Sequence, residues 1–188
     1  MHIITIPHPT LRAVAEPVSQ PTIEHAQFIA RLEDTLRKTR NPKGVGLAAP
    51  QVDKRWRIFT TAIDQQPLTF INPQIIGSSD VLTLGPNADD PILEGCLSMP
   101  HLWGPVPRHQ WVDVQFETLE GDPATELKLV RQERRFVDFF ARVVQHEFDH
   151  LDGVLFTDHS LHYDLPVYLE NEKTKKSEEV ERSFLELL

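Results

Sequence analysis

The chain contains a single cysteine, Cys96, among its 188 residues. One cysteine cannot form an internal disulfide, so we expect a reducing compartment and a thiol that is free for chemistry. No apolar run approaches the ~20 residues that a membrane-spanning helix requires. The N-terminal residues lack the basic region and the apolar core of a signal peptide, so none is expected. These absences predict a soluble cytoplasmic protein with no membrane partner.

Positive charge is also scarce, with 19 Lys and Arg residues against 28 Asp and Glu and a net charge of −9. Binding to a phosphate backbone requires a basic stripe that releases counterions, so no nucleic-acid partner is predicted. The length and the composition suit a single globular domain over residues 1–188. Within it we expect a core at about residues 40–155, an N-terminal segment and helix at 1–40, and a variable C-terminal tail at 161–188.

A helix is predicted from Thr22 to about Arg40, because Thr22 can cap it and Ile29, Leu32 and Leu36 form part of an apolar face. Further along, turn residues separate short segments with the alternation typical of strands. These strands are predicted at 55–63, 68–72, 74–76, 81–84 and 111–119. The residues between them include Asp64, Asn72-Pro73 and the loop residues Asp89 and Asp90. A turn at 120–123 then leads from the last of these strands to a partner strand that ends near Val130.

Two histidines in the stretch Gln145–His150 are four residues apart, and so lie on one side of a helix. Both imidazoles of His146 and His150 can reach one metal ion, and Glu147 can contact a water at that ion. The spacing of the surrounding apolar residues predicts this helix. Those residues are Phe136, Phe139, Phe140, Val143, Val144 and Leu151. The alternative is a pair of surface histidines, but ligands at the floor of an apolar pocket explain better why the apolar stripe runs up to them.

A third ligand is not found at its usual places. In one class of zinc proteases it is a histidine six residues after the second histidine, but Phe156 occupies that position. Another class uses a glutamate from a later helix, and here Glu170 and Glu172 lie in a charged tail without other support. The best remaining candidate is Cys96.

Three stretches then resemble, in order, the signature motifs of the peptide deformylase family. They are GVGLAAPQ at residues 44–51, EGCLS at 94–98 and QHEFDHLDG at 145–153. The resemblance covers about residues 40–155. It implies an α+β fold in which antiparallel β-sheets wrap around a central metal-binding helix that carries the HExxH motif.

The resemblance also implies roles for individual residues. The metal ligands correspond to Cys96, His146 and His150, the general base to Glu147, and the oxyanion donors to the Gln51 side chain and the Leu97 backbone N–H. An extended peptide would bind along the backbone near Gly46 and Gly95. Val45, Phe139 and Val143 would form an apolar wall suited to a methionine side chain. Glu94 and Arg108 would form a supporting ion pair beside the Cys96 loop, the alternative being two separate surface charges.

The implied activity is metal-dependent removal of the formyl group from N-terminal formylmethionine, with release of formate. The substrates would be N-formylmethionyl peptides and nascent chains, free or at the ribosome, in a bacterial or organellar-type translation compartment. Fe²⁺ is the expected ion, although a Cys/His/His site also accepts Zn²⁺, Ni²⁺ or Co²⁺. The alternatives are a zinc endopeptidase, which would not need Cys96 or Gln51, and a non-catalytic module that binds metal or peptide.

Several residues near these motifs have two interpretations at this point. Arg142 either lines the rim of the pocket or faces solvent, and Gln145 either orients a ligand or is an ordinary polar helix residue. Asp149 and Asp152 either accept hydrogen bonds from the ligand histidines or are solvated. The stretch His101–Trp103 is expected beside the peptide groove. The histidines without ligand spacing are treated as ordinary, namely His101, His109, His159 and His162.

Overall fold

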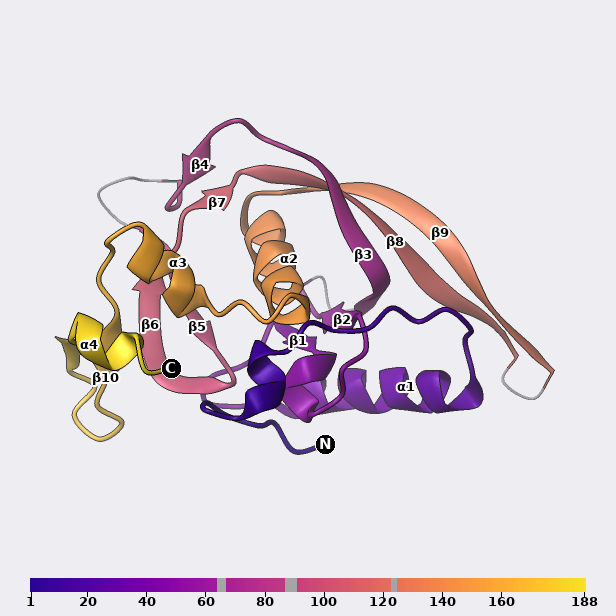
Figure 1. Cartoon of the computed structure of the whole chain (residues 1–188), viewed down its shortest axis with the longest axis horizontal. Coiled ribbons are helices and arrows are strands. Elements are labelled where there is room, and N and C mark those ends of the chain that lie inside the picture. The colour runs from indigo at the N-terminus through magenta and orange to yellow at the C-terminus, as the bar shows by residue number, and fades with distance from the viewer. Residues whose placement is uncertain (64–66, 87–90, 123–124) are drawn as a thin grey trace.

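The computed structural model describes residues 1–63, 67–86, 91–122 and 125–188. The predicted turn and loop residues Asp64, Asp89, Asp90 and Pro123 lie outside the described residues. Antiparallel sheets and a few helices make up the fold (Figure 1). The helices are α1 (Ile23–Lys38), α2 (Asp138–Leu151), α3 (Phe156–His162) and α4 (Arg182–Leu185), with 3-10 turns η1 (Pro9–Arg12) and η2 (Ala49–Val52).

All the strand pairs in these sheets are antiparallel. The largest sheet has, in spatial order, β1 (Gly46–Ala48), β2 (Ile58–Thr61), β3 (Leu68–Ser78), β8 (Trp111–Asp122) and β9 (Glu126–Val137). A second sheet has β11 (Ser177–Glu179), β10 (Tyr168–Glu170), β6 (Met99–Pro105) and β5 (Leu93–Cys96). A short pair joins β4 (Leu82–Thr83) to β7 (Arg108–His109).

Helix α2 lies at the centre of the molecule, beneath the arch of β3, β7, β8 and β9 (Figure 1). It packs against β1, β2, β7, β8, β9 and η2. The predicted fold class, antiparallel sheets around a central helix that carries HExxH, is confirmed.

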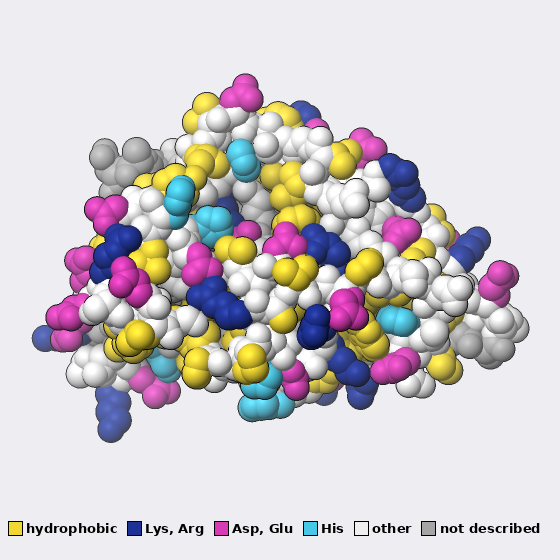
Figure 2. Space-filling view, viewed as in Figure 1, with side chains coloured by type: hydrophobic (Ala, Val, Ile, Leu, Met, Phe, Trp, Pro, Cys, Tyr) yellow, Lys and Arg dark blue, Asp and Glu magenta, His cyan; other side chains and the backbone are white. Residues whose placement is uncertain are grey.

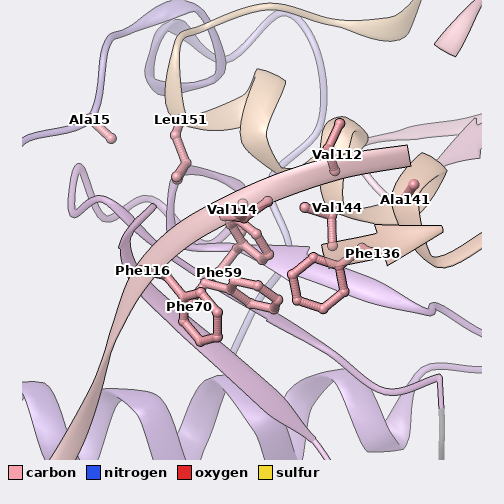
Figure 3. Close-up of a cluster of buried hydrophobic side chains, with 11 residues drawn as sticks. Ala15, Phe59, Phe70, Val112, Val114, Phe116, Phe136, Ala141, Val144 and Leu151 are labelled. Carbon is pink, nitrogen blue, oxygen red and sulfur yellow. The ribbon is translucent and has the colours of Figure 1, made fainter. Parts of the chain in front are cut away.

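One face of α2 is buried in an aromatic core on the large sheet (Figure 3). Helix α2 contributes Ala141, Val144 and Leu151 to this core, and these residues have helical spacing. The sheet contributes a chain of phenylalanines, in which Phe70 lies 4.4 Å from Phe59 and 4.5 Å from Phe116 between ring centroids. Burial of each such ring stabilises the fold by about 1.5–3 kcal/mol. The core therefore fixes the helix and directs its other face, with His146 and His150, toward Cys96.

The predicted first helix is confirmed as α1. The Thr22 backbone N–H donates to His25 Nδ1 at 3.1 Å, which satisfies one of the free donors at the start of the helix. Leu32 and Leu36 are buried, and Ile29 is partly buried against the same cluster.

Two predicted boundaries are wrong. Phe136 belongs to β9, which extends to Val137 instead of ending near Val130, and α2 begins only at Asp138. Asn72-Pro73 is not a turn between strands but lies inside β3, at a register shift between Ile71 and Gln74. Asn72 has a φ of 49° there, and its side chain bonds both the N–H and the C=O of Val18. Sheet pairing on either side thus overrides the local turn signal.

The charged tail after Glu170 forms β11 and α4. Together with β10 it adds to the sheet of β5 and β6, where Tyr168 pairs with Trp103 and Leu169 with Leu102.

Acidic and basic side chains are interspersed over the face shown in Figure 2. Within the described residues, no helix is both long enough and apolar enough to cross a membrane.

Candidate metal centre

The predicted ligands Cys96, His146 and His150 come together. Cys96 is the last residue of β5, and the two histidines are one turn apart on α2. One ligand atom from each of the three side chains lies within 4.8 Å of the others, and Cys96 Sγ is 3.2 Å from His150 Nε2. Although burial raises the pKa of Cys96, the neighbouring imidazoles of His150 and His146 lower it to about 5. A thiolate with two imidazoles fits a divalent transition-metal ion.

Glu94 fixes the orientation of His146. Its Oε2 lies 3.0 Å from His146 Nδ1, an arrangement that leaves Nε2 for a ligand bond. Burial raises the pKa of Glu94, but Arg108 and His146 more than offset this and hold it well below its usual range. Glu94 is therefore a carboxylate, and it can accept a hydrogen bond from the Nδ1–H of His146 while keeping its charge.

The predicted ion pair between Glu94 and Arg108 is present and buried. Arg108 Nε donates to Glu94 Oε1 at 3.0 Å and Nη2 donates to Oε2 at 2.9 Å, which is the bidentate geometry of strong Arg–carboxylate pairs. Its Nη1 donates to Asp149 Oδ2 at 2.6 Å, and His159 Nε2 lies 2.8 Å from the same oxygen. Asp149 thus binds Arg108 and His159, and His159 is not an ordinary surface histidine.

Gln145 of α2 and Asp152, which follows the helix, were each given two interpretations, and both bond residues other than the ligands. Gln145 Oε1 accepts from the His109 N–H at 3.0 Å, and Gln145 Nε2 donates to the His109 C=O at 2.9 Å. This amide therefore attaches α2 to β7. Asp152 accepts from Arg57 at 2.6 Å.

Glu147 lies beside the ligands and is only 3% exposed. No described residue donates a hydrogen bond to its Oε2. Burial raises the pKa of Glu147 to about 7, although His146 and His150 act in the opposite direction. Gly46 of β1 packs directly on this carboxylate, since a Cβ built at Gly46 would lie 2.3 Å from Glu147 Oε1. A buried carboxyl group with a pKa near neutrality can exchange protons at cellular pH.

The amide of Gln51 is held with its donor end toward the Cys96 loop. Its Oε1 accepts from the Ala48 N–H at 2.8 Å. Nε2 consequently points the other way, 3.4 Å from Cys96 Sγ and 3.3 Å from Ser98 Oγ. Hydrogen bonding within η2 and β1 thus presents an N–H₂ group to the ligand cluster.

A cavity of about 230 Å³ opens onto this cluster. It is bordered by residues predicted from the sequence, namely Val45, Gly46, Gln51, Glu94, Gly95, Cys96, Leu97, Phe139, Val143, His146 and Glu147. Trp103, expected beside the peptide groove, and Arg142, for which the pocket rim was one interpretation, also line it. The remaining wall residues had no role assigned from the sequence, namely Pro42, Lys43, Gly44, Ile92 and Leu93. Trp103 packs on Gly95, where a Cβ would lie 2.6 Å from the indole ring.

A family model described as "Polypeptide deformylase" matches residues 1–164. The chain belongs to the peptide deformylase family. Peptide deformylase 2 of Nostoc sp. is 37% identical over 166 residues, covering 83% of each chain. The peptide deformylase of Treponema pallidum is 37% identical over 161 residues, covering 84% of this chain and 86% of the relative.

Solved peptide deformylases have the same fold. A class I type b peptide deformylase from Acinetobacter baumannii superposes with a TM-score of 0.69 at 34% identity, covering 83% of this chain and 96% of that one. The enzyme from Synechococcus elongatus, in complex with actinonin, gives 0.68 at 30% identity, covering 92% and 80%. The predicted family, enzyme class and metal dependence are thereby confirmed, and this deformylase is a metal-dependent hydrolase.

Arg142 is the residue of the deformylase cavity that sequence reasoning placed least well. It is 5% exposed and donates to Glu94, so neither of its two interpretations, a rim residue or a solvated one, describes it fully. Its partners lie 36 to 59 residues away in the sequence. The one local signal is its position, directly before the pocket-lining Val143 and four residues before His146.

Proposed function

We propose that this deformylase removes the formyl group from N-terminal formylmethionine of new polypeptides through the Cys96–His146–His150 centre. The observation that carries the proposal is the convergence of three ligand atoms beside a buried Glu147 oxygen that has no hydrogen-bond partner among the described residues, next to one cavity. Cys96, His146 and His150 would hold the ion. When bound there, a divalent ion acts as a Lewis acid and lowers the pKa of a coordinated water.

The residues around the centre would carry the proton and the developing charge. Glu147 takes a proton from the attacking water and returns it to the departing peptide nitrogen. The Gln51 amide and the Leu97 backbone N–H donate to the formyl oxygen as it becomes negative, a contribution of about 3–4 kcal/mol per donor in other hydrolases. Glu94 and Arg108 act in support, since they hold the ring of His146 in place.

The substrate peptide would lie between the two strands that border the cavity. Glu147 and Trp103 fill the Cβ positions of Gly46 in β1 and Gly95 in β5, so both strands would present bare backbone to an extended peptide. Val45, Phe139 and Val143 then receive the first side chain. A neutral formylated terminus enters such a site at low cost, whereas a cationic free amine must lose its hydration.

Fe²⁺ is the ion that we propose for this centre, by its family resemblance and its Cys/His/His ligands. Affinity alone does not select it, since Zn²⁺, Ni²⁺ and Co²⁺ suit the same ligands. Metal analysis of protein prepared without oxygen, with activity measured on the same sample, identifies the ion. Activity that follows zinc content and not iron content would contradict the proposal.

The activity itself is tested by formate release from formyl-Met-Ala-Ser, measured alongside cleavage of internal peptide bonds. Formate release without internal cleavage is the expected result. Internal cleavage would favour a zinc endopeptidase, and the absence of both reactions would favour a module that only binds metal or peptide.

We also propose the cytoplasm, or an organellar-type translation compartment, as the place of this reaction, because formylated chains are made there. Nascent chains would then be the natural substrate. Cosedimentation with ribosomes that carry a formylated nascent chain, compared with empty ribosomes, tests whether the enzyme acts at the ribosome.

Formyl-Met peptides should exceed formyl-Asp and formyl-Lys peptides in kcat/KM by at least roughly a hundredfold. Aspartate or lysine would bury a charge against Val45, Phe139 and Val143 without a partner, at a cost of a few kcal/mol. Steady-state kinetics on formyl-Xaa-Ala-Ser peptides checks this. Equal kcat/KM for the Met and Asp peptides would show that the first side chain does not enter this cavity.

Gly46→Ala should lower kcat by roughly 100-fold, because the new Cβ, 2.3 Å from Glu147 Oε1, must displace the carboxylate by about 1 Å. Gly77→Ala is the matched control, since the atoms nearest to its Cβ would belong to the Asp113 side chain, the first of them at 3.1 Å. Both variants are compared with the wild type at equal metal content. A wild-type kcat in Gly46→Ala would show that the position of Glu147 is not critical.

A further inference from the structure

Arg142 is a buried arginine in the wall of the cavity that would receive the first side chain of the substrate. It lies on α2, one turn before His146, and lines the cavity together with Phe139 and Val143. The same side chain borders a second cavity of about 450 Å³, which Thr83 also lines. The guanidinium therefore lies between the two cavities.

Three acceptors hold this guanidinium without using all of its donors. Nη1 donates to Glu94 Oε1 at 2.8 Å and to the Val106 C=O at 2.6 Å, while Nη2 donates to the Thr83 C=O at 2.9 Å. A guanidinium has five N–H groups, so Nε–H and one N–H of Nη2 have no acceptor among the described residues. These donors can bond an acceptor on a group that enters an adjoining cavity.

The neighbouring Glu94 decides which kind of acceptor suits this position. Its carboxylate is 2.8 Å from Arg142 Nη1, and together with Asp149 it balances the charges of Arg142 and Arg108. A second carboxylate from a substrate would approach Glu94 and meet like-charge repulsion. A neutral acceptor, such as a sulfoxide or an amide oxygen, takes the hydrogen bond without that penalty.

We propose that Arg142 is a specificity-determining residue that lets the first-residue pocket accept a neutral hydrogen-bond acceptor at the end of an unbranched side chain. Methionine sulfoxide is such a side chain, because it keeps the length of methionine and adds one oxygen. The enzyme would thus deformylate peptides whose first methionine has been oxidised. This inference rests on the proposed function, since it concerns the same cavity.

The test compares kcat/KM for formyl-Met-Ala-Ser, its sulfoxide analogue and formyl-norleucine-Ala-Ser in the wild type and in Arg142→Met. In the wild type, the sulfoxide peptide should be within about tenfold of the methionine peptide. In Arg142→Met, the ratio of sulfoxide to methionine should fall by about tenfold or more, as expected for a lost hydrogen bond to a charged group. The norleucine-to-methionine ratio should not change, because norleucine lacks an acceptor.

Such ratios do not depend on the fraction of each preparation that is folded and metal-loaded. Phe139→Leu is the matched control: it changes an apolar part of the same wall and should leave the sulfoxide-to-methionine ratio unchanged. Calorimetric binding of the same peptides in a Glu147→Gln background adds a readout without turnover, and the sulfoxide peptide should lose affinity only when Arg142 is also replaced.

An unchanged sulfoxide-to-methionine ratio in Arg142→Met would overturn the inference, as would an equal fall in Phe139→Leu. If no formylated peptide is turned over by the wild type, the proposed function itself fails. If formyl-Met-Ala-Ser is turned over but the sulfoxide-to-methionine ratio is the same in Arg142→Met as in the wild type, only the inference fails.

Discussion

Glu147→Gln protein is expected to retain its metal and to lose roughly 10²–10⁴-fold in kcat. The amide has nearly the same shape as the carboxylate but cannot take a proton from water. Glu147 is 3% exposed, and no described residue donates to its Oε2, so the group that would receive this proton is not neutralised by an ion pair. The measurement is kcat for formyl-Met-Ala-Ser at equal metal content.

The control is Glu133→Gln, which makes the same chemical change on the exposed surface of β9 and should leave kcat unaltered. The pH profile gives a second check. As the proposed base, Glu147 must be ionised, so kcat/KM should fall as pH drops through its pKa. Burial raises that pKa to about 7, and a bound cation lowers it again, so we expect the acid limb somewhat below neutrality. An acid limb that persists in Glu147→Gln would assign the proton transfer to another group.

Cys96→Ala is expected to lose bound metal and activity together, and His146→Ala and His150→Ala should behave alike. Each removes one of three converging ligand atoms. The loss of metal affinity should exceed the roughly 10–100-fold effect that removal of an outer hydrogen-bond partner has. Metal content after dialysis against a weak chelator is the measurement, with circular dichroism to verify folding.

His162→Ala serves as the control, because this histidine is exposed near the end of α3 and contacts the Tyr163 ring. It should keep both metal and activity. Full metal occupancy in Cys96→Ala would remove the cysteine from the ligand set and would reopen the search for a third ligand.

The metal-binding helix was predictable from the sequence because its signal is local. His146 and His150 are one turn apart, so helical geometry alone places them together. Cys96 joins them from 50 residues before His146, and no helical period predicts that approach. Cys96 was the best remaining candidate because the usual positions of a third ligand hold no suitable residue. The order of the three motifs then indicated a cysteine ligand through the family resemblance.

Other features depend on the pairing of distant strands and were therefore missed. Phe136 lies three residues before Phe139, a helical spacing, yet Phe136 pairs with Val112 across the sheet and belongs to β9. Asn72-Pro73 is a strong turn signal, but the strand continues through it because β2 and β8 hold β3 on both sides. Arg142 is buried because its acceptors are Glu94 and the carbonyls of Thr83 and Val106.

The direct junction of β9 and α2 makes the centre sensitive to residue count. Val137 ends the strand and Asp138, with a φ of 50°, begins the helix, so no loop lies between them to absorb a change in length. One residue inserted at this junction would rotate the rest of α2 by about 100° about its axis. His146 and His150 would then turn away from Cys96. By contrast, the exposed turn between β10 and β11 can change length without moving these three residues.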